Sequence, residues 1–331
     1  MDAIAESVFD NTMPHAAVDD TPSHLSVILE TSAAGWLAIP QTTLKQVSEA
    51  LLVALNAHLA SNTSNQVSVL ASGVQRSEFL FPTPEDTHAK HHNGTSTLVS
   101  SKLYSLFRHV DEEVLHRLDA HIQTEGNGCD KGTLAGGTSM ALAYIRRCQA
   151  ETAALKARIL IISITDDSAI PYIPVMNCIF AAQKMKTSID VCQLGPASSF
   201  LQQAADATGG VYMDVKHPQG LIQYLTTAFF VDTSLRPFMV LPSQNNVDFR
   251  ASCFVTGGVV ERGYVCGVCL CILKDVPQRN FCPVCGSRFD DLVISKLRRG
   301  PVVTRKKKRK TDALQTPLTP AAEQPEAVTD D

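Results

Sequence analysis

The sequence lacks the segments that direct a chain into or across a membrane. Its first twenty residues are acidic and contain no apolar core of a signal peptide. The longest uncharged runs, such as residues 168–183, are too short to span a bilayer, and Pro171 and Pro174 interrupt that run. A net charge of −4 over 331 residues gives no overall case for binding nucleic acid or a membrane surface. We therefore expect a chain with no membrane partner.

The patterns of common catalytic sites are also missing. The glycine-rich stretch 126–137 is not followed by the Gly-Lys-Ser/Thr of a phosphate-binding loop, and no dinucleotide-binding fingerprint occurs. The sequence shows neither a Ser-His-Asp order nor paired carboxylates in a catalytic context. These absences predict that the chain is not an enzyme.

Cysteine spacing is the most specific feature that is present. Cys266 and Cys269 form one C-x2-C pair, and Cys282 and Cys285 form a second pair a short distance along the chain. Two such pairs at this separation predict that four thiolates surround a single Zn²⁺ ion. Because four protein ligands leave no coordination position open for water or substrate, this zinc would be structural. It would hold together a module that is too small to bury an adequate core.

Two disulfides are the alternative interpretation of these pairs. The other cysteines are scattered without a pattern, and no secretory signal accompanies them, so reduced thiols are favoured. Cys271 brings a fifth sulfur into the module, but it has no partner at C-x2-C spacing and is not predicted to be a ligand. The six cysteines outside the two pairs are Cys129, Cys148, Cys178, Cys192, Cys253 and Cys271.

Apolar runs alternate with amphipathic stretches from residue 23 to residue 230. Leu25–Leu29 is typical of a buried strand, and Leu44–Leu59 repeats its apolar residues at helical spacing. The most hydrophobic run, Arg158–Thr165, predicts a central strand flanked by helices on both faces. The alternation predicts a mostly parallel, doubly wound α/β sheet of about six strands. Further strands are expected at 66–71, 78–81, 189–194 and 211–214, a loop at 31–40, and further helices at 110–123, 138–154, 175–185, 199–208 and 221–230.

Changes in composition divide the chain into five predicted segments. A polar stretch at 82–101 contains His88, His91 and His92, and we expect a solvated loop there rather than a metal site. The basic run 305–310 predicts a nuclear import signal, with nonspecific DNA contact as the second interpretation, and both favour the nucleus. The segments are a flexible N-terminal segment (1–22), the α/β domain (23–232), a linker (233–248), the four-cysteine zinc module (249–295) and a disordered basic tail (296–331).

Polar residues cluster at the predicted sheet edge where α/β proteins bind ligands. Glu30, Ser32 and Ala34 follow the first strand, Thr138 opens a helix, and Asp166 follows the central strand. This arrangement resembles the von Willebrand factor A fold, whose metal-ion-dependent adhesion site uses an Asp-x-Ser-x-Ser loop, a threonine loop and an aspartate loop. Here Glu30 replaces the aspartate and Ala34 replaces the second serine. Since Mg²⁺ requires near-ideal octahedral geometry, we expect no Mg²⁺ and hydrogen-bonding roles for Glu30 and Asp166.

The combination of an A-type domain with a four-cysteine module narrows the resemblance. Together with Phe249–Phe254 and Gly263–Leu270, it resembles the family of small von Willebrand A subunits of the general transcription and repair factor TFIIH, over residues 23–290. The resemblance implies a nuclear, non-catalytic structural subunit of the TFIIH core, acting in nucleotide excision repair and RNA polymerase II transcription initiation. It also implies contacts of the A-type domain with other core subunits, especially with the larger von Willebrand A sibling subunit through that partner's RING-like zinc domain.

Two functions from other classes stay open. A zinc-dependent DNA-binding transcription regulator would place Lys274, Arg279 and Arg288 on phosphates, but acidic residues interleave with these three along the chain. Direct DNA contact is therefore expected to be absent or nonspecific. A RING-type ubiquitin ligase needs ligands for two zinc ions, whereas this module supplies ligands for one.

Overall fold

The computed structural model describes residues 21–82, 104–124, 132–167, 170–232, 235–242 and 247–299. Residues 1–20 of the predicted N-terminal segment, residues 83–101 with the three histidines, and the basic run 305–310 lie outside these ranges. The chain divides into two compact units, one of residues 1–275 and 283–285 and one of residues 276–282 and 286–331. The five segment boundaries stay predictions. No helix in the described ranges has both the length and the hydrophobicity that a membrane span needs.

A six-stranded sheet forms the centre of the first unit, in the order β3-β2-β1-β4-β5-β6. Neighbouring strands pair in parallel, except β2 and β3, which form an antiparallel edge pair. The predicted mostly parallel, doubly wound sheet is thus confirmed, and the predicted central strand, β4, lies between β1 and β5. The strands are β1 (Ser23–Glu30), β2 (Gln66–Ser72), β3 (Ser77–Phe81), β4 (Lys156–Ser163), β5 (Ser188–Gln193) and β6 (Tyr212–Asp214).

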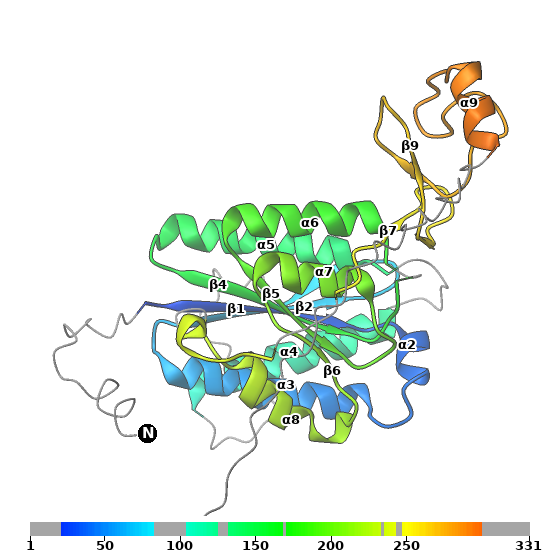
Figure 1. Cartoon of the computed structure of the whole chain (residues 1–331). Helices are drawn as coiled ribbons and strands as arrows, with labels where there is room; N and C mark the ends of the chain where they lie inside the picture. The colour runs from blue at the N-terminus through cyan, green and yellow to red at the C-terminus, as the bar shows by residue number, and fades with distance from the viewer. Residues whose placement is uncertain are drawn as a thin grey trace, which may run out of the picture. The chain divides into compact units, whose positions relative to one another are not determined.

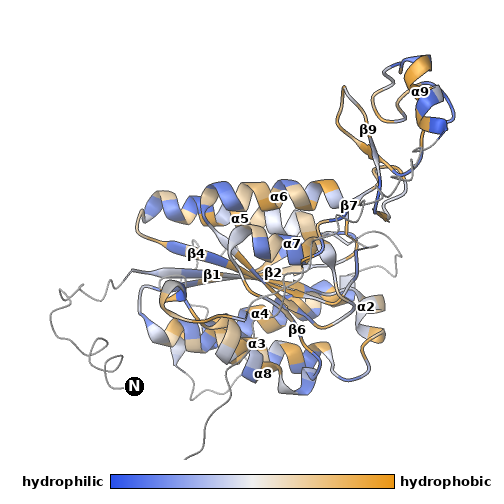
Figure 2. Ribbon diagram, viewed as in Figure 1, coloured by the Kyte–Doolittle hydropathy of each residue, from blue (hydrophilic) through white to orange (hydrophobic). Residues whose placement is uncertain are grey.

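Helices cover both faces of this sheet. Figure 1 shows α5, α6 and α7 over one face and α3, α4 and α8 over the other. Successive strand residues face opposite layers, so Ile28 packs in the core under α5 to α7, whereas Val27 and Leu29 pack in the core under α3, α4 and α8. Hydrophobic and hydrophilic residues recur along each helix in Figure 2, as expected for helices with one face on a core. The helices are α3 (Leu44–Ser61), α4 (Ser105–Thr124), α5 (Leu134–Glu151), α6 (Tyr172–Met185), α7 (Ser199–Thr208) and α8 (Leu221–Tyr224), which continues as the π-helical turn η2 (Leu225–Phe229).

Helix α2 (Ala33–Leu37) was not predicted. The predicted loop 31–40 contains this helix, which buries none of its residues and therefore leaves no amphipathic pattern in the sequence. The indole N–H of Trp36 donates to the carbonyl oxygen of Glu30 at 2.9 Å. This hydrogen bond ties α2 to the end of β1.

Helix α5 begins earlier than predicted. The expected start was Thr138, but the helix starts at Leu134, so the last two glycines of the predicted loop, Gly136 and Gly137, lie in its first turn. A Cβ atom on Gly137 would lie 3.4 Å from both Ile28 Cγ2 and Ser77 Oγ. Glycine therefore lets the first turn of α5 approach the sheet closely.

Very short hairpins and one helix are the regular elements of residues 251–299. The strands β7 (Ala251–Ser252) and β8 (Val259–Val260) pair with each other, as do β9 (Tyr264–Val265) and β10 (Ile272–Leu273). Helix α9 (Asp291–Arg298) ends within the segment predicted as the basic tail. Since two-residue strands bury little apolar surface, these hairpins need another source of stability.

Two histidines are buried where β1 begins. The ring nitrogen Nε2 of His24 lies 3.0 Å from Ser68 Oγ, and Nε2 of His58 lies 3.3 Å from the carbonyl oxygen of Ser23. Burial is the main cause that lowers the pKa of each ring from 6.5 to about 4, and the nearby charge of Arg158 adds to the effect on His58. Both histidines are therefore neutral in the folded protein near neutral pH.

Acid should destabilise the sheet domain through these two residues. The unfolded chain takes up their protons near pH 6.5, whereas the folded chain resists protonation down to about pH 4. The free energy of unfolding should therefore fall as the pH drops through this window, by up to roughly 3 kcal/mol per histidine. Urea unfolding at several pH values measures this slope, and His58→Gln should make it shallower. Equal slopes for the variant and the original chain would contradict the assignment to His58.

Candidate metal centre

The first cysteine pair lies on a tight turn closed by two backbone hydrogen bonds. The N–H of Leu270 donates to the carbonyl oxygen of Cys266 at 3.0 Å, and the N–H of Cys266 donates to that of Cys271 at 3.1 Å. Leu270 has a left-handed backbone with φ of 61°, which costs a residue with a side chain roughly 1–2 kcal/mol. The turn adopts this conformation although the residue at this position is not a glycine.

The second pair lies on a turn of the same geometry. The N–H of Gly286 donates to the carbonyl oxygen of Cys282 at 3.0 Å, and the N–H of Cys282 donates to that of Ser287 at 2.9 Å. Gly286 has φ of 71°, in the same left-handed region. Cys285 therefore holds the same place in this turn as the second cysteine of the first pair holds in the other.

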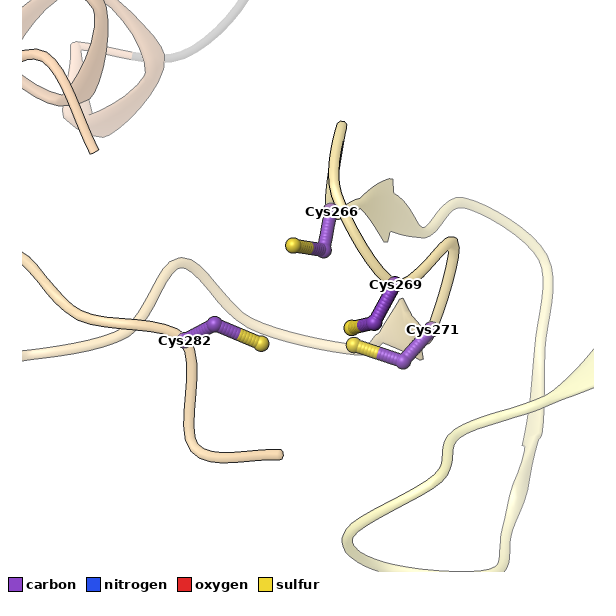
Figure 3. A group of neighbouring side chains, drawn as sticks. All are labelled: Cys266, Cys269, Cys271 and Cys282. Atoms are coloured by element: carbon purple, nitrogen blue, oxygen red, sulfur yellow. The ribbon is translucent and has the colours of Figure 1, made fainter. Parts of the chain in front are cut away.

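The sulfur atoms of both pairs gather at one place. The Sγ atoms of Cys266, Cys269, Cys271 and Cys282 all lie within 4.8 Å of one another, and Figure 3 shows their side chains pointing toward a shared centre. The Sγ atoms of Cys266 and Cys285 are 3.9 Å apart. Tetrahedral zinc with Zn–S bonds of about 2.3 Å requires sulfurs about 3.8 Å apart. The donors and their spacing therefore fit a zinc ion that would be held by thiolates alone.

The predicted ligands were Cys266, Cys269, Cys282 and Cys285. The structure gathers three of them with Cys271 in place of the fourth, and it puts Cys285 close to Cys266. The choice between Cys271 and Cys285 stays a prediction. In the part of the chain that is described, none of the cysteines forms a disulfide.

Neighbouring sulfurs oppose ionisation of Cys269. The backbone N–H of Cys271 favours the thiolate, but desolvation and the sulfurs of Cys271, Cys285 and Cys266 together raise the pKa of Cys269 above its usual range. A divalent cation reverses this balance, because each thiolate that binds it gains a positive neighbour. Zinc binding at this cluster would therefore release protons.

A third turn has the same geometry but lacks the second cysteine. The N–H of Gly257 donates to the carbonyl oxygen of Cys253 at 2.8 Å, and the N–H of Cys253 donates to that of Gly258 at 2.9 Å. Thr256 stands where the second cysteine would be, and the Cys253 sulfur accepts the N–H of Lys274 at 3.3 Å. Burial acts to raise the pKa of Cys253, but hydrogen bonds from Thr256 and nearby N–H groups lower it overall. The repeated Cys-x3-Gly spacing in the sequence is the signal for this turn.

The A-type edge of the sheet is organised around a buried carboxylate. Glu30 Oε2 accepts hydrogen bonds from Ser163 Oγ at 2.9 Å and from the N–H groups of Ile164 and Thr165 at 2.7 and 3.2 Å, while Oε1 accepts from Thr165 Oγ1 at 2.9 Å. Burial raises the pKa of Glu30 against the lowering effect of these donors. Both carboxylate oxygens are therefore used inside the protein, in the hydrogen-bonding role predicted for Glu30.

The other residues of the predicted edge differ in their surroundings. Thr138 Oγ1 is buried and donates to Leu134 O at 2.8 Å, whereas Ala34 and Asp166 are exposed. Ser32 precedes α2 without a capping hydrogen bond from its side chain. Among the described residues, the cysteine cluster is the group of at least three His, Cys, Asp or Glu side chains that lies close enough to hold a metal ion.

Asp167, the neighbour of Asp166, caps a helix from its position after the central strand. Its carboxylate accepts the N–H groups of Ser199 and Phe200 at 3.0 and 3.2 Å and so caps the amino end of α7. The sequence did not indicate this helix cap, because Asp167 lies far along the chain from Ser199 and Phe200.

Known proteins are similar to this chain over both the sheet domain and the two cysteine pairs. The family model described as Transcription factor Tfb4 matches residues 22–286. The General transcription and DNA repair factor IIH subunit TFB4 of Debaryomyces hansenii is 41% identical, over 95% of this chain and 97% of that protein. The subunit of the same name from Saccharomyces cerevisiae is 42% identical, over 94% of this chain and 98% of that protein.

A solved structure matches the sheet domain. The crystal structure of the TFIIH p34 N-terminal domain superposes with a TM-score of 0.55 and 31% sequence identity, covering 63% of this chain and 98% of that one. The sheet described above is therefore similar to a von Willebrand A-like domain of known structure.

The purified chain should contain one zinc ion. Elemental analysis measures this ratio, and Cys282→Ser should release the metal and unfold the cysteine turns, because metal-binding energy is folding energy in such a small module. Cys271→Ser should keep the metal. A ratio near two, or loss of zinc from Cys271→Ser as complete as from Cys269→Ser, would contradict the predicted ligand set.

Proposed function

Since the chain belongs to the Tfb4 family, we propose that it is a structural subunit of the general transcription and DNA repair factor TFIIH. The observation that carries the proposal is the family match over residues 22–286, which includes both the sheet domain and the two cysteine pairs. The relatives named TFB4 are also matched over nearly their whole length. Within TFIIH the chain acts in nucleotide excision repair and in RNA polymerase II transcription initiation, in the nucleus.

The role is non-catalytic. At the sheet edge where α/β proteins bind ligands, the Glu30 carboxylate is occupied by hydrogen bonds from the loop after β4. The cysteine cluster supplies enough sulfurs to surround a zinc ion, which makes that ion structural. Both features support a chain that acts by holding other proteins.

Exposed hydrophobic side chains support protein contacts of the A-type domain. Leu37 on α2 is 86% exposed, and Phe180 on α6 is 58% exposed. Ile173 lies two turns before Phe180 on the same side of α6 and is also exposed. Such side chains gain most by being covered in a complex. The partners are other TFIIH core subunits, especially the larger sibling subunit through its RING-like zinc domain.

Basic side chains of the cysteine module are engaged within the module. Arg288 lies 3.4 Å from the carboxylate of Asp291, and Arg298 donates to the carbonyl oxygens of Pro277 and Gln278. These contacts lower the positive potential available to phosphates. They favour the structural role over a DNA-binding regulator.

The tagged full-length chain should copurify with the other TFIIH core subunits from nuclear extract. Mass spectrometry of the captured proteins measures this, with an unrelated tagged nuclear protein as the control. Recovery of the chain without any TFIIH subunit, or its accumulation outside the nucleus, would contradict the proposal.

Binding of the full-length chain to the sibling subunit should not depend on added Mg²⁺. The Glu30 carboxylate is used internally, so affinity must come from buried apolar area and polar complementarity. Titration of Mg²⁺ into the two zinc-loaded proteins should leave the dissociation constant unchanged, and Asp166→Ala should cost little. Mg²⁺-dependent binding, or loss of binding in a folded Asp166→Ala variant, would contradict this prediction and would indicate that Glu30, Ser32, Thr138 and Asp166 bind a metal ion.

A further inference from the structure

Five sulfurs surround the candidate zinc position, one more than a tetrahedral ion binds. Cys266, Cys269, Cys271 and Cys282 lie within 4.8 Å of one another, and Cys285 lies 3.9 Å from Cys266. The Cys269 sulfur contacts those of both Cys271 and Cys285. A structural zinc site takes four protein ligands. One sulfur is therefore left over whenever the other four bind the ion.

Backbone geometry makes Cys285 a regular ligand and Cys271 the surplus one. Cys285 follows Cys282 at the spacing with which Cys269 follows Cys266, and both turns close with a 3.0 Å hydrogen bond onto the first cysteine. Cys271 instead lies just after its turn, where its carbonyl oxygen accepts the N–H of Cys266 at 3.1 Å. Its sulfur nevertheless reaches the cluster, as Figure 3 shows.

Solvent exposure separates these two cysteines. Cys285 is exposed, whereas Cys271 is only 7% exposed. An exposed sulfur ligand is open to protonation and to electrophiles, because both must reach the sulfur from solvent. A buried sulfur beside the ion is protected from the same attack. Cys285 is therefore more readily lost than the buried ligands Cys266 and Cys282, as is Cys269, which is also exposed, and Cys271 is the buried sulfur already in position.

We propose that Cys271 is a reserve ligand, which binds the zinc when Cys285 leaves it. The exchange breaks the Zn–S bond to Cys285 and forms one to Cys271. The Cys271 thiol releases its proton and the Cys285 thiolate takes one up, so the charge of the site is unchanged. The four sulfurs that then bind the ion are those that the structure holds within 4.8 Å of one another.

Removal of a different cysteine has another consequence. Without Cys282, any set of four sulfurs must include both Cys271 and Cys285, whereas among the described residues Cys282 is the cysteine of the second turn whose sulfur lies within 4.8 Å of those of Cys266, Cys269 and Cys271 together. The reserve therefore compensates for Cys285 and not for Cys282. This asymmetry is what an experiment can detect. The inference rests on the zinc ion of the proposed function.

Zinc per chain should be measured by elemental analysis on the full-length protein after dialysis against a competing chelator. Cys285→Ser and Cys271→Ser should each keep one zinc, whereas the double variant and Cys282→Ser should lose it. The double variant Cys253→Ser/Cys285→Ser is the matched control and should keep its zinc, because Cys253 lies on the third turn. Circular dichroism checks that the sheet domain stays folded in each variant.

Cobalt substitution shows which atoms bind. Co²⁺ added to Cys285→Ser should give the absorption of a site with four thiolates, and this absorption should be absent when Cys271 is also replaced. Loss of zinc from Cys285→Ser as complete as from Cys282→Ser would overturn the proposal, as would a three-thiolate cobalt spectrum or zinc retention in Cys271→Ser/Cys285→Ser. Absence of zinc from the original chain would instead overturn the zinc site itself.

Discussion

The hydrogen bonds around the Glu30 carboxylate decide what the ligand-binding edge of the sheet can do. The side chain leaves the end of β1 and accepts donors from Ser163, Ile164 and Thr165 where β4 ends. A metal at this edge would need the same oxygens, and each donor left without its acceptor would cost about 1–3 kcal/mol. The longer arm of glutamate, compared with aspartate, lets the carboxylate reach the neighbouring strand. The residue therefore forms an internal connection between the two central strands.

The cysteine turns obey the opposite constraint. Their strands are only two residues long, so apolar burial contributes little and the positions of the sulfurs dominate the fold. The left-handed backbone of Leu270 illustrates this. A glycine would adopt this backbone without strain, but the turn has the same geometry with a leucine at this position. Energy from metal–sulfur bonds can offset such strain, since it contributes directly to the stability of a small metal-binding module.

The features that the sequence predicted well are those with a regular spacing. Alternating apolar runs predicted the mostly parallel sheet with β4 as a central strand, and paired C-x2-C spacing predicted three of the four cysteines whose sulfurs gather. Contacts between distant residues were not accessible in this way. The position of Cys271 beside the second pair and the cap that Asp167 provides for α7 depend on how the chain folds back. Helix α2 was missed for a different reason, because it has no buried face and so no periodic pattern.

The turn of Cys253–Gly257 has the geometry of the two cysteine-pair turns but carries one cysteine, and its packing explains why it does not need a second. Its hairpin, β7 with β8, is supported by the sheet domain, since Val259 packs against the core under α5 to α7. Gln203 on α7 also donates to the carbonyl oxygens of Asp248 and Arg250 beside this hairpin. A turn held in this way needs no metal, and Thr256 in place of a second cysteine is tolerated there. The hairpin of β9 and β10 lies outside that hydrophobic core, and the sulfurs of its turn are the ones that face the metal position. A zinc ion would therefore contribute most to stability at the turns that the sheet domain does not hold.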